Sequence, residues 1–281
     1  MKQAKTTFGI LSSFFVIAVL ISAFVIAEPK AREEGTSRGG SIVMIPSHAI
    51  EVAEGVFSLG AAVDDSGNVV EGYAVFHHRN GHDGGPNNGN DGGDSGSTCY
   101  SYLSNGAKWN TVEPWVLNPT NSEGLDSNFL LTNMEGNIVK WENEAGVNIM
   151  GTGSLTNEVL EADTDSPDNV NEVYFADVDN PGAIAVTIVW GVFRGPPSQR
   201  GLISWDMVFD DVDFDWSNTG DLTKMDFENI AAHEVGHAVG MGHAPQTAEC
   251  LPETMFPTAS NGETSKRDLH DGDKAGVSAL Y

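Results

Sequence analysis

Basic residues are scarce in this sequence of 281 residues. Only 14 lysines and arginines stand against 40 aspartates and glutamates, so the formal net charge is −26 at pH 7. Binding to nucleic-acid phosphates needs a basic surface, and this balance therefore argues strongly against a nucleic-acid partner. A strong negative charge suits a soluble exported protein, in which it can also serve solubility alone. The length allows one main domain with a smaller attachment.

Cysteine is the second scarcity. Cys99 and Cys250 are the only two cysteines, so the chain can form at most one disulfide. In an oxidising, exported location a bridge between them is favoured, and it would close a loop of about 150 residues. Two unrelated free cysteines are the alternative that the residues leave open.

The N-terminus has the pattern of a targeting segment. Lys2 and Lys5 precede an apolar run over residues 8–27, and small residues before Glu28 suit signal peptidase. The run is long for a signal peptide and nearly long enough to span a bilayer, so both a cleaved signal and an uncleaved anchor stay open. Either case predicts an exported chain, which is secreted or anchored to the outer face of the membrane by this segment alone.

Composition divides the remaining chain into three parts. Residues 28–79 are predicted to form a small β-rich N-terminal region, with a propeptide as one interpretation. Within it, apolar runs over residues 56–63 and 69–76 flank turn-forming residues and predict a hairpin. Residues 80–97 are rich in Gly, Asn and Asp and predict a linker. Residues 98–281 form the main region.

Two adjacent histidines, His77 and His78, follow the second run of the hairpin. Successive residues of a strand face opposite sides of a sheet. We therefore expect no joint metal role for this pair.

The main region combines strand-like and helix-like stretches. An apolar stripe at steps of four, four and three residues predicts a helix over residues 122–144, formed by Leu130, Met134, Ile138 and Trp141. Apolar and β-branched runs predict strands over residues 107–118, 171–178, 183–190 and 201–209. Two further helices are expected, over residues 221–241 and 265–281. The first of these two carries the strongest motif in the chain.

That motif is H-E-x-x-H-x-x-G-x-x-H, which begins at His233. On a helix His233 and His237 lie at positions i and i+4, so both imidazoles point from one face and can bind one Zn²⁺. Gly240 can adopt a positive φ and end the helix, so that His243 returns as a third nitrogen ligand. Glu234 lies close enough to hold a water without ligating the metal. Three protein ligands leave the fourth position open, as in catalytic zinc sites.

This motif resembles the signature of the metzincin zinc peptidases. Met255, followed by Phe256 and Pro257, resembles the Met-turn beneath the zinc in that clan, and the matrixin branch in particular. The resemblance covers residues 108–281. It implies an α+β, zincin-like domain with a twisted mixed sheet, a zinc-site helix and a small C-terminal subdomain, in which Met255 is a hydrophobic floor under the histidines.

Three matrixin features are missing. The sequence has no H-x-D set for a second, structural zinc and no P-R-C-G latency motif, and Ala244 rather than Ser follows His243. Latency through a Cys99 thiolate on the zinc is a further alternative to the disulfide. The residues around Cys99 do not resemble the matrixin latency motif.

The resemblance implies an exported zinc endopeptidase that hydrolyses protein or peptide substrates. Glu234 would take a proton from the attacking water and deliver it to the leaving amine. An extended peptide would add antiparallel to an edge strand over residues 183–190, with a specificity pocket shaped by residues 255–260. Two alternatives remain, a zinc hydrolase that acts on a non-peptide amide and a surface or binding protein that retains the zinc site.

A cluster of carboxylates follows the strand predicted over residues 201–209. Asp206, Asp210, Asp211 and Asp213 lie in or after it, and such clusters suit Ca²⁺, which takes six to eight oxygen ligands. Some matrixins bind calcium at a similar distance before the zinc helix. A solvated acidic loop explains the same residues.

Overall fold

A large mixed β-sheet organises the part of the chain that the structure describes. The computed structural model describes Met1 and residues 42–81 and 99–281. The predicted targeting segment and most of the predicted linker lie outside these residues. Among the helices of the described ranges, none has the length and apolar character that a bilayer crossing requires.

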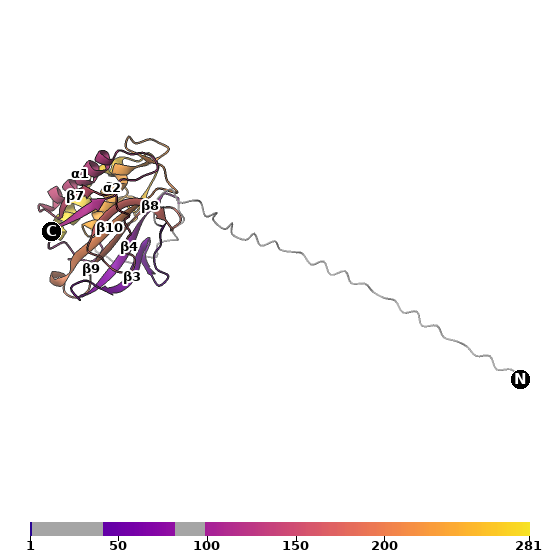
Figure 1. The fold of residues 1–281 in the computed structure, drawn as a ribbon, viewed down its shortest axis with the longest axis horizontal. Helices are drawn as coiled ribbons and strands as arrows, with labels where there is room; N and C mark the ends of the chain where they lie inside the picture. Colours follow the sequence, from indigo (N-terminus) through magenta and orange to yellow (C-terminus); the bar gives the residue numbers. More distant parts are fainter. Residues whose placement is uncertain (2–41, 82–98) are drawn as a thin grey trace. The chain divides into compact units, whose positions relative to one another are not determined.

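The strands of this sheet come from almost every part of the described chain (Figure 1). Their order across the sheet is β2 (Ile50–Ala53), β3 (Val56–Val63), β4 (Val69–Arg79), β9 (Ala183–Val192), β10 (Gly201–Asp210), β8 (Asn171–Val178), β6 (Glu113–Leu117) and β7 (Met150–Leu155). Strands β10, β8, β6 and β7 run parallel, whereas β9 is antiparallel to both of its neighbours. Two short strands extend the pairing, β1 (Ile42–Val43) on β8 and β14 (Thr258–Ala259) on β4. This mixed sheet and its helices fit the expected α+β class.

The helices begin and end where capping residues direct them. α1 (Ser127–Ala145) begins after Asp126, whose carboxylate accepts two backbone N–H bonds, and it ends at Gly146 with a φ of 72°. α2 (Phe227–Ala238) begins after Asp226, which accepts the N–H of Asn229. The remaining elements are α3 (Asp271–Leu280), the 3-10 turns η1 (Pro197–Gln199) and η2 (Ser265–Arg267), and the strand pairs β5 (Ser101–Tyr102) with β13 (Met241–Gly242) and β11 (Trp216–Ser217) with β12 (Met225–Asp226).

The two faces of the sheet are buried in different hydrophobic clusters. Side chains alternate along a strand, so Val189 of β9 packs on the helix side while Ile188 and Trp190 pack on the other side. The predicted stripe of α1 is buried in the helix-side cluster. α2 packs against β9 and against α1. The helix that carries the histidine motif is therefore enclosed, and all but one of its residues are buried.

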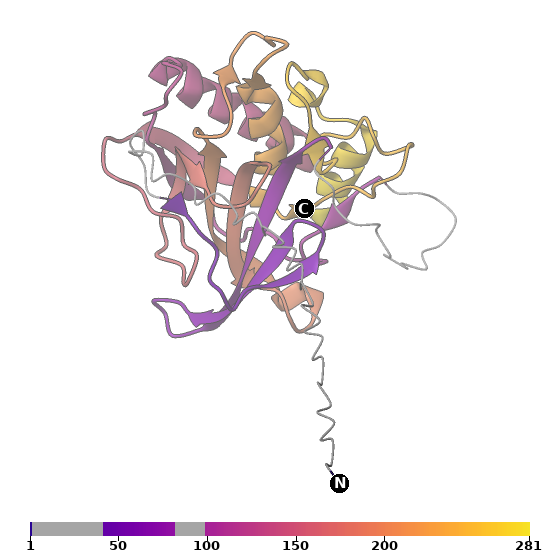
Figure 2. The same ribbon diagram turned by 90° about the vertical axis from the view of Figure 1, so that its right-hand side faces the viewer.

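The N-terminal hairpin does not form a region of its own, contrary to the prediction for residues 28–79. β4 pairs with β9 over most of its length, and Figure 2 shows the purple strands β3 and β4 in one sheet with the salmon strands that follow later in the chain. Val70, Ala74 and Phe76 are buried in the same cluster as Ile188. A hairpin of this size cannot bury enough apolar surface alone, and it shares the core of the main sheet.

The predicted edge strand is also an interior strand. β9 has β10 on one side and β4 on the other, so neither of its edges is open to another chain. The prediction for residues 183–190 was right about the strand itself and wrong about its place in the sheet.

Candidate metal centre

α2 places two histidines one turn apart. His233 and His237 are both fully buried, and their Nε2 atoms lie 3.1 Å apart. Each Nδ1 makes a hydrogen bond with a backbone carbonyl, at 2.6 Å from His233 to Thr254 and at 2.9 Å from His237 to Met241. A carbonyl only accepts, so each Nδ1 carries the proton and each Nε2 presents a lone pair to the other.

The third histidine arrives after a sharp change of chain direction. Gly240 has a φ of 104°, and a Cβ built there would lie 2.8 Å from the carbonyl oxygen of Ala107. Only glycine tolerates both conditions, so the turn that returns His243 depends on it. The ring centroid of His243 lies 4.8 Å from that of His237 and 5.4 Å from that of His233. Nε2 of His243 is buried and has no hydrogen-bond partner.

These three nitrogens fit a metal ion. A ligand nitrogen of each of the three histidines lies within 4.8 Å of the other two. Two facing lone pairs repel each other, and a buried polar atom without a partner costs about 1–3 kcal/mol. One cation between the rings would relieve both costs, and neutral imidazole is a preferred zinc ligand. Burial lowers the pKa of all three histidines, that of His237 to about 4, which keeps them neutral.

Glu234 lies beside this centre and is fully buried. Its Oε2 accepts a hydrogen bond of 2.6 Å from the hydroxyl of Thr187, which belongs to β9. Burial raises the pKa of Glu234 to about 8, against the opposing effects of Thr187 and Lys266. Thr187 thus fixes one carboxylate oxygen and leaves the other directed away from it.

Met255 packs directly under the histidine helix. A Cβ built on Gly236 of α2 would lie 2.2 Å from Sδ of Met255, so the absence of a side chain there permits the contact. The turn that carries Met255 is held by Asp273 of α3, whose carboxylate accepts the backbone N–H groups of Thr254 and Met255. α2, the turn at Met255 and α3 are therefore joined by packing and hydrogen bonds.

Two residues that the sequence did not predict as part of the site, His77 and Lys266, also reach this centre. His77 of β4 stacks on His233, with ring centroids 3.7 Å apart and planes at 24°. Its Nδ1 lies 3.2 Å from Oε1 of Glu234, and neither of these atoms has another hydrogen-bond partner. Lys266 lies 3.4 Å from Nε2 of His77 and donates to the carbonyls of Phe256 and Thr258. Burial lowers the pKa of this lysine to about 8.

The sequence analysis considered His77 only together with His78, as a pair that could share a metal ion. His77 and His78 do face opposite sides of β4, as expected, and so they share no site. His77 alone faces α2, on the side of the sheet where the histidines of the motif lie. Its place depends on the pairing of β4 with β9, which residues more than 100 positions apart create.

The four carboxylates predicted for calcium are not brought together. Asp206 accepts the N–H groups of Asp163 and Glu172 inside the sheet. Asp210 accepts backbone N–H bonds that include those of Val212 and Asp213, and Asp211 accepts two bonds from Ser122. Among the described residues, the carboxylate, histidine and cysteine groups that could hold a metal ion include none of these four. The oxygens of Asp210 and Asp211 accept hydrogen bonds at the strand end and its turn, whereas those of Asp206 accept them inside the sheet.

The two cysteines are joined in a disulfide that spans 151 residues of sequence. Cys250 lies in the loop between His243 and Met255, and it is fully buried. The bridge ties the start of the main region to this loop. Neither cysteine is free to bind a metal in this structure.

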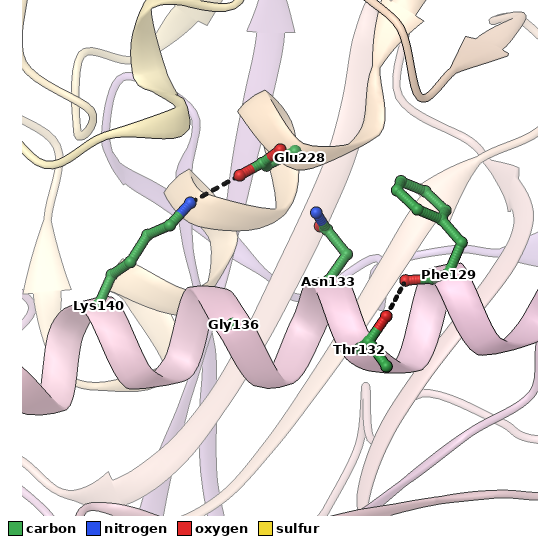
Figure 3. Close-up of a pocket in the computed structure, with 6 residues that line it drawn as sticks. All are labelled: Phe129, Thr132, Asn133, Gly136, Lys140 and Glu228. Carbon is green, nitrogen blue, oxygen red and sulfur yellow. Dashed lines mark hydrogen bonds and ion pairs between the residues drawn. The ribbon is translucent and has the colours of Figure 1, made fainter.

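A shallow pocket lies between α1 and the first turn of α2 (Figure 3). It is lined by Phe129, Thr132, Asn133, Gly136, Lys140 and Glu228, and an ion pair of 2.7 Å joins the last two. None of these residues belongs to the histidine cluster, so this pocket is no part of the metal centre.

Three imidazoles that converge beneath a mixed sheet define the class of this protein, an α+β domain with three clustered histidines that could hold a metal ion. Comparison with known proteins relates part of this domain to a peptidase family. Residues 194–281 match the family model for matrixin, a family for which zinc is the expected metal. Over these residues the chain is matrixin-like.

Two curated relatives each match 25% of this chain. Metalloendoproteinase 2-MMP of Arabidopsis thaliana is 36% identical over 78 residues, which are 25% of this chain and 19% of that protein. Metalloendoproteinase 1 of Glycine max is 35% identical over 77 residues, which are 25% of this chain and 24% of that protein. The match thus spans less than a quarter of either relative. Among solved structures, metalloproteinase-II of Bacteroides fragilis aligns with 12% identity over 82% of this chain and 79% of that chain. The TM-score of this alignment is 0.32, which is too low to show a shared fold.

Proposed function

We propose that this chain is an exported, zinc-dependent endopeptidase that cleaves protein or peptide substrates. The observation that carries the proposal is the convergence of three buried imidazole nitrogens beside the carboxylate of Glu234. Both curated relatives are named metalloendoproteinases, which supports the same activity. Export rests on the apolar segment of residues 8–27, which lies outside the described residues.

His233, His237 and His243 would hold the zinc through Nε2. When bound, zinc lowers the pKa of water and polarises a peptide carbonyl. The carbonyls of Thr254 and Met241 orient the first two rings, because they accept the protons on Nδ1. These two backbone carbonyls therefore decide that each ring presents Nε2, rather than Nδ1, to the zinc.

Glu234 is the general base in this proposal. Thr187 holds Oε2, and Oε1 is left to take a proton from the attacking water and to pass it to the leaving amine. Met255 has no chemical part. It supports the helix from below, where Gly236 leaves room for its sulfur.

The test is Glu234→Gln in the full chain, with Glu228→Gln as its matched control. Both residues lie on α2, but Glu228 is half-exposed and pairs with Lys140 away from the centre. At equal zinc content, Glu234→Gln should lower the hydrolysis of unfolded casein by roughly 10²–10⁴-fold, the usual contribution of one general base. Glu228→Gln should match the wild type, and a chelator should abolish the activity of both. Near-native hydrolysis by Glu234→Gln would remove Glu234 from this role.

A further inference from the structure

We infer that β4 occupies the place of a peptide substrate, and that His77 closes the metal centre from within the chain. This inference rests on the proposed function, because it concerns the substrate site of that same centre. The residues that carry it come from three separated segments, which are β4, β9 and the segment after Met255.

β4 pairs with β3 over Val69–Val75, and only its end, beyond Val75, lies between β9 and β14. On one side it runs antiparallel to β9, with Phe76 opposite Val186 and His77 opposite Ala185. On the other side its end runs parallel to β14, where the N–H of His78 bonds to the carbonyl of Pro257. A peptidase binds an extended peptide through this type of main-chain pairing. The sequence predicted a substrate in this place, antiparallel to residues 183–190 and beside residues 255–260.

The side chain of His77 then fills the space beside the centre. It covers the ring of His233 in a stacked contact and places Nδ1 3.2 Å from Oε1 of Glu234. On its far side Nε2 faces the ammonium group of Lys266. The carboxylate oxygen proposed to receive the proton of water is thus in contact with a residue of the chain itself.

Burial shows that this arrangement excludes a substrate. His77, His233, Glu234 and His237 each have no exposed surface. The edge of β9 that a peptide would need is already paired, and its other edge is taken by β10. A second peptide strand cannot use hydrogen-bonding groups that β4 already satisfies. The described conformation is therefore a closed state of the proposed enzyme.

Opening requires only the end of β4 to move. The register between β4 and β9 is irregular between His77 and His78, so the pairing is interrupted where the strand passes the centre. Val70 and Ala74, which are buried in the second cluster, lie earlier in the strand and can stay in place. Phe76 is buried in the same cluster, so the closing element is the segment from His77 to Arg79.

The test measures access to the centre in the zinc-loaded full chain. The probe is a peptide hydroxamate, which joins an extended peptide to a zinc-chelating group, and its affinity is measured by calorimetry. His77→Ala removes a buried aromatic stack and a carboxylate contact, so the affinity should rise about tenfold or more. His48→Ala is the matched control, because His48 lies in a turn outside this segment and bonds to the carbonyl of Leu59. It should bind the hydroxamate like the wild type.

A second measurement needs no variant. Hydrogen–deuterium exchange of the wild type, followed by mass spectrometry, should show faster exchange over residues 77–79 when the hydroxamate is bound. Equal hydroxamate affinities for the wild type, His77→Ala and His48→Ala, or unchanged exchange in this segment of the bound wild type, would overturn the inference.

The outcome for this inference is distinct from that for the proposed function. If the hydroxamate affinity rises in His77→Ala but no variant hydrolyses casein in a zinc-dependent way, the closed centre stands and the peptidase proposal fails. If the wild type hydrolyses casein as fast as His77→Ala and binds the hydroxamate equally well, the peptidase proposal stands and the closing role of His77 fails.

Discussion

Replacing Gly236 by alanine tests the packing that supports the metal centre. Gly236 lies on α2 between the two histidines of the motif, and it faces the turn at Met255. A Cβ at this position would lie 2.2 Å from Sδ of Met255 and 2.7 Å from the ring of Trp141. Both neighbours are fully buried, so neither can move into solvent.

The magnitude follows from two opposing terms. Inserting a methyl group into a packed core usually costs about 1–3 kcal/mol. Alanine is better than glycine in the interior of a helix by about 1 kcal/mol, and this gain offsets part of the cost. We expect Gly236→Ala to lower the free energy of unfolding by up to about 2 kcal/mol, after the two terms are combined.

Gly136 provides the matched control, because it is also an interior helix glycine. A Cβ built on it meets nothing within 4 Å, since Gly136 lines the open pocket of Figure 3. Gly136→Ala should therefore keep the helix gain and raise the free energy of unfolding by up to about 1 kcal/mol. The two variants have the same chemistry and opposite expected signs.

The assay is urea unfolding of the metal-free proteins, followed by tryptophan fluorescence. Removing the metal is necessary because a bound ligand adds its own stabilisation to the folded state. If Gly236→Ala is more stable than the wild type by as much as Gly136→Ala, with an unchanged denaturant slope, the contact with Met255 is not tight and the reasoning is refuted. A destabilised Gly136→Ala would refute the helix term.

Three further predictions concern the metal, the disulfide and the pH. His243→Ala should lower zinc occupancy after dialysis, measured by mass spectrometry of the metal, and wild-type occupancy would contradict its role as a ligand. Cys250→Ser and Cys99→Ser should each lower the free energy of unfolding, by up to about 5 kcal/mol for a bridge across 151 residues, and the double variant should add nothing in urea unfolding. Burial, and to a lesser extent the charge of Asp168, raises the pKa of Glu172 from an ordinary 4.5 to about 7. Between these two pH values the folded chain holds a proton that the unfolded chain has released. The free energy of unfolding therefore falls as the pH rises through this range. Glu172→Gln should flatten the fall in melting temperature between pH 4.5 and about pH 7, and an unchanged slope would count against the shift.

Local pattern was sufficient for much of the fold. The strand over residues 171–178 was predicted with its observed bounds, and β9 and β10 were predicted to within two residues at each end. Periodicity located α1 and the histidine motif located α2, and the observed beginnings of the two helices depend on Asp126 and Asp226. These features depend on neighbours within a few residues, so the sequence alone contains them.

Strand β7 was not predicted from local pattern, because it contains two glycines. β7 contains Gly151 and Gly153, which weaken a strand signal. In the structure a Cβ at Gly153 would lie 2.3 Å from the ring of Trp115. The glycine is explained by a close contact with a distant tryptophan, and only the folded sheet reveals that contact.

The same distinction applies to the site. The spacing of His233 and His237 on one helix turn follows from the sequence, as does the glycine that lets His243 return. The approach of His77 does not, because it depends on the pairing of β4 with a strand more than 100 residues later. Strand pairing between distant segments is decided by how the whole core is buried, and alternation along one strand shows only which residues share a face. The sequence alone therefore determined the motif that can bind a metal, and the tertiary structure decided that a strand of the same chain covers it.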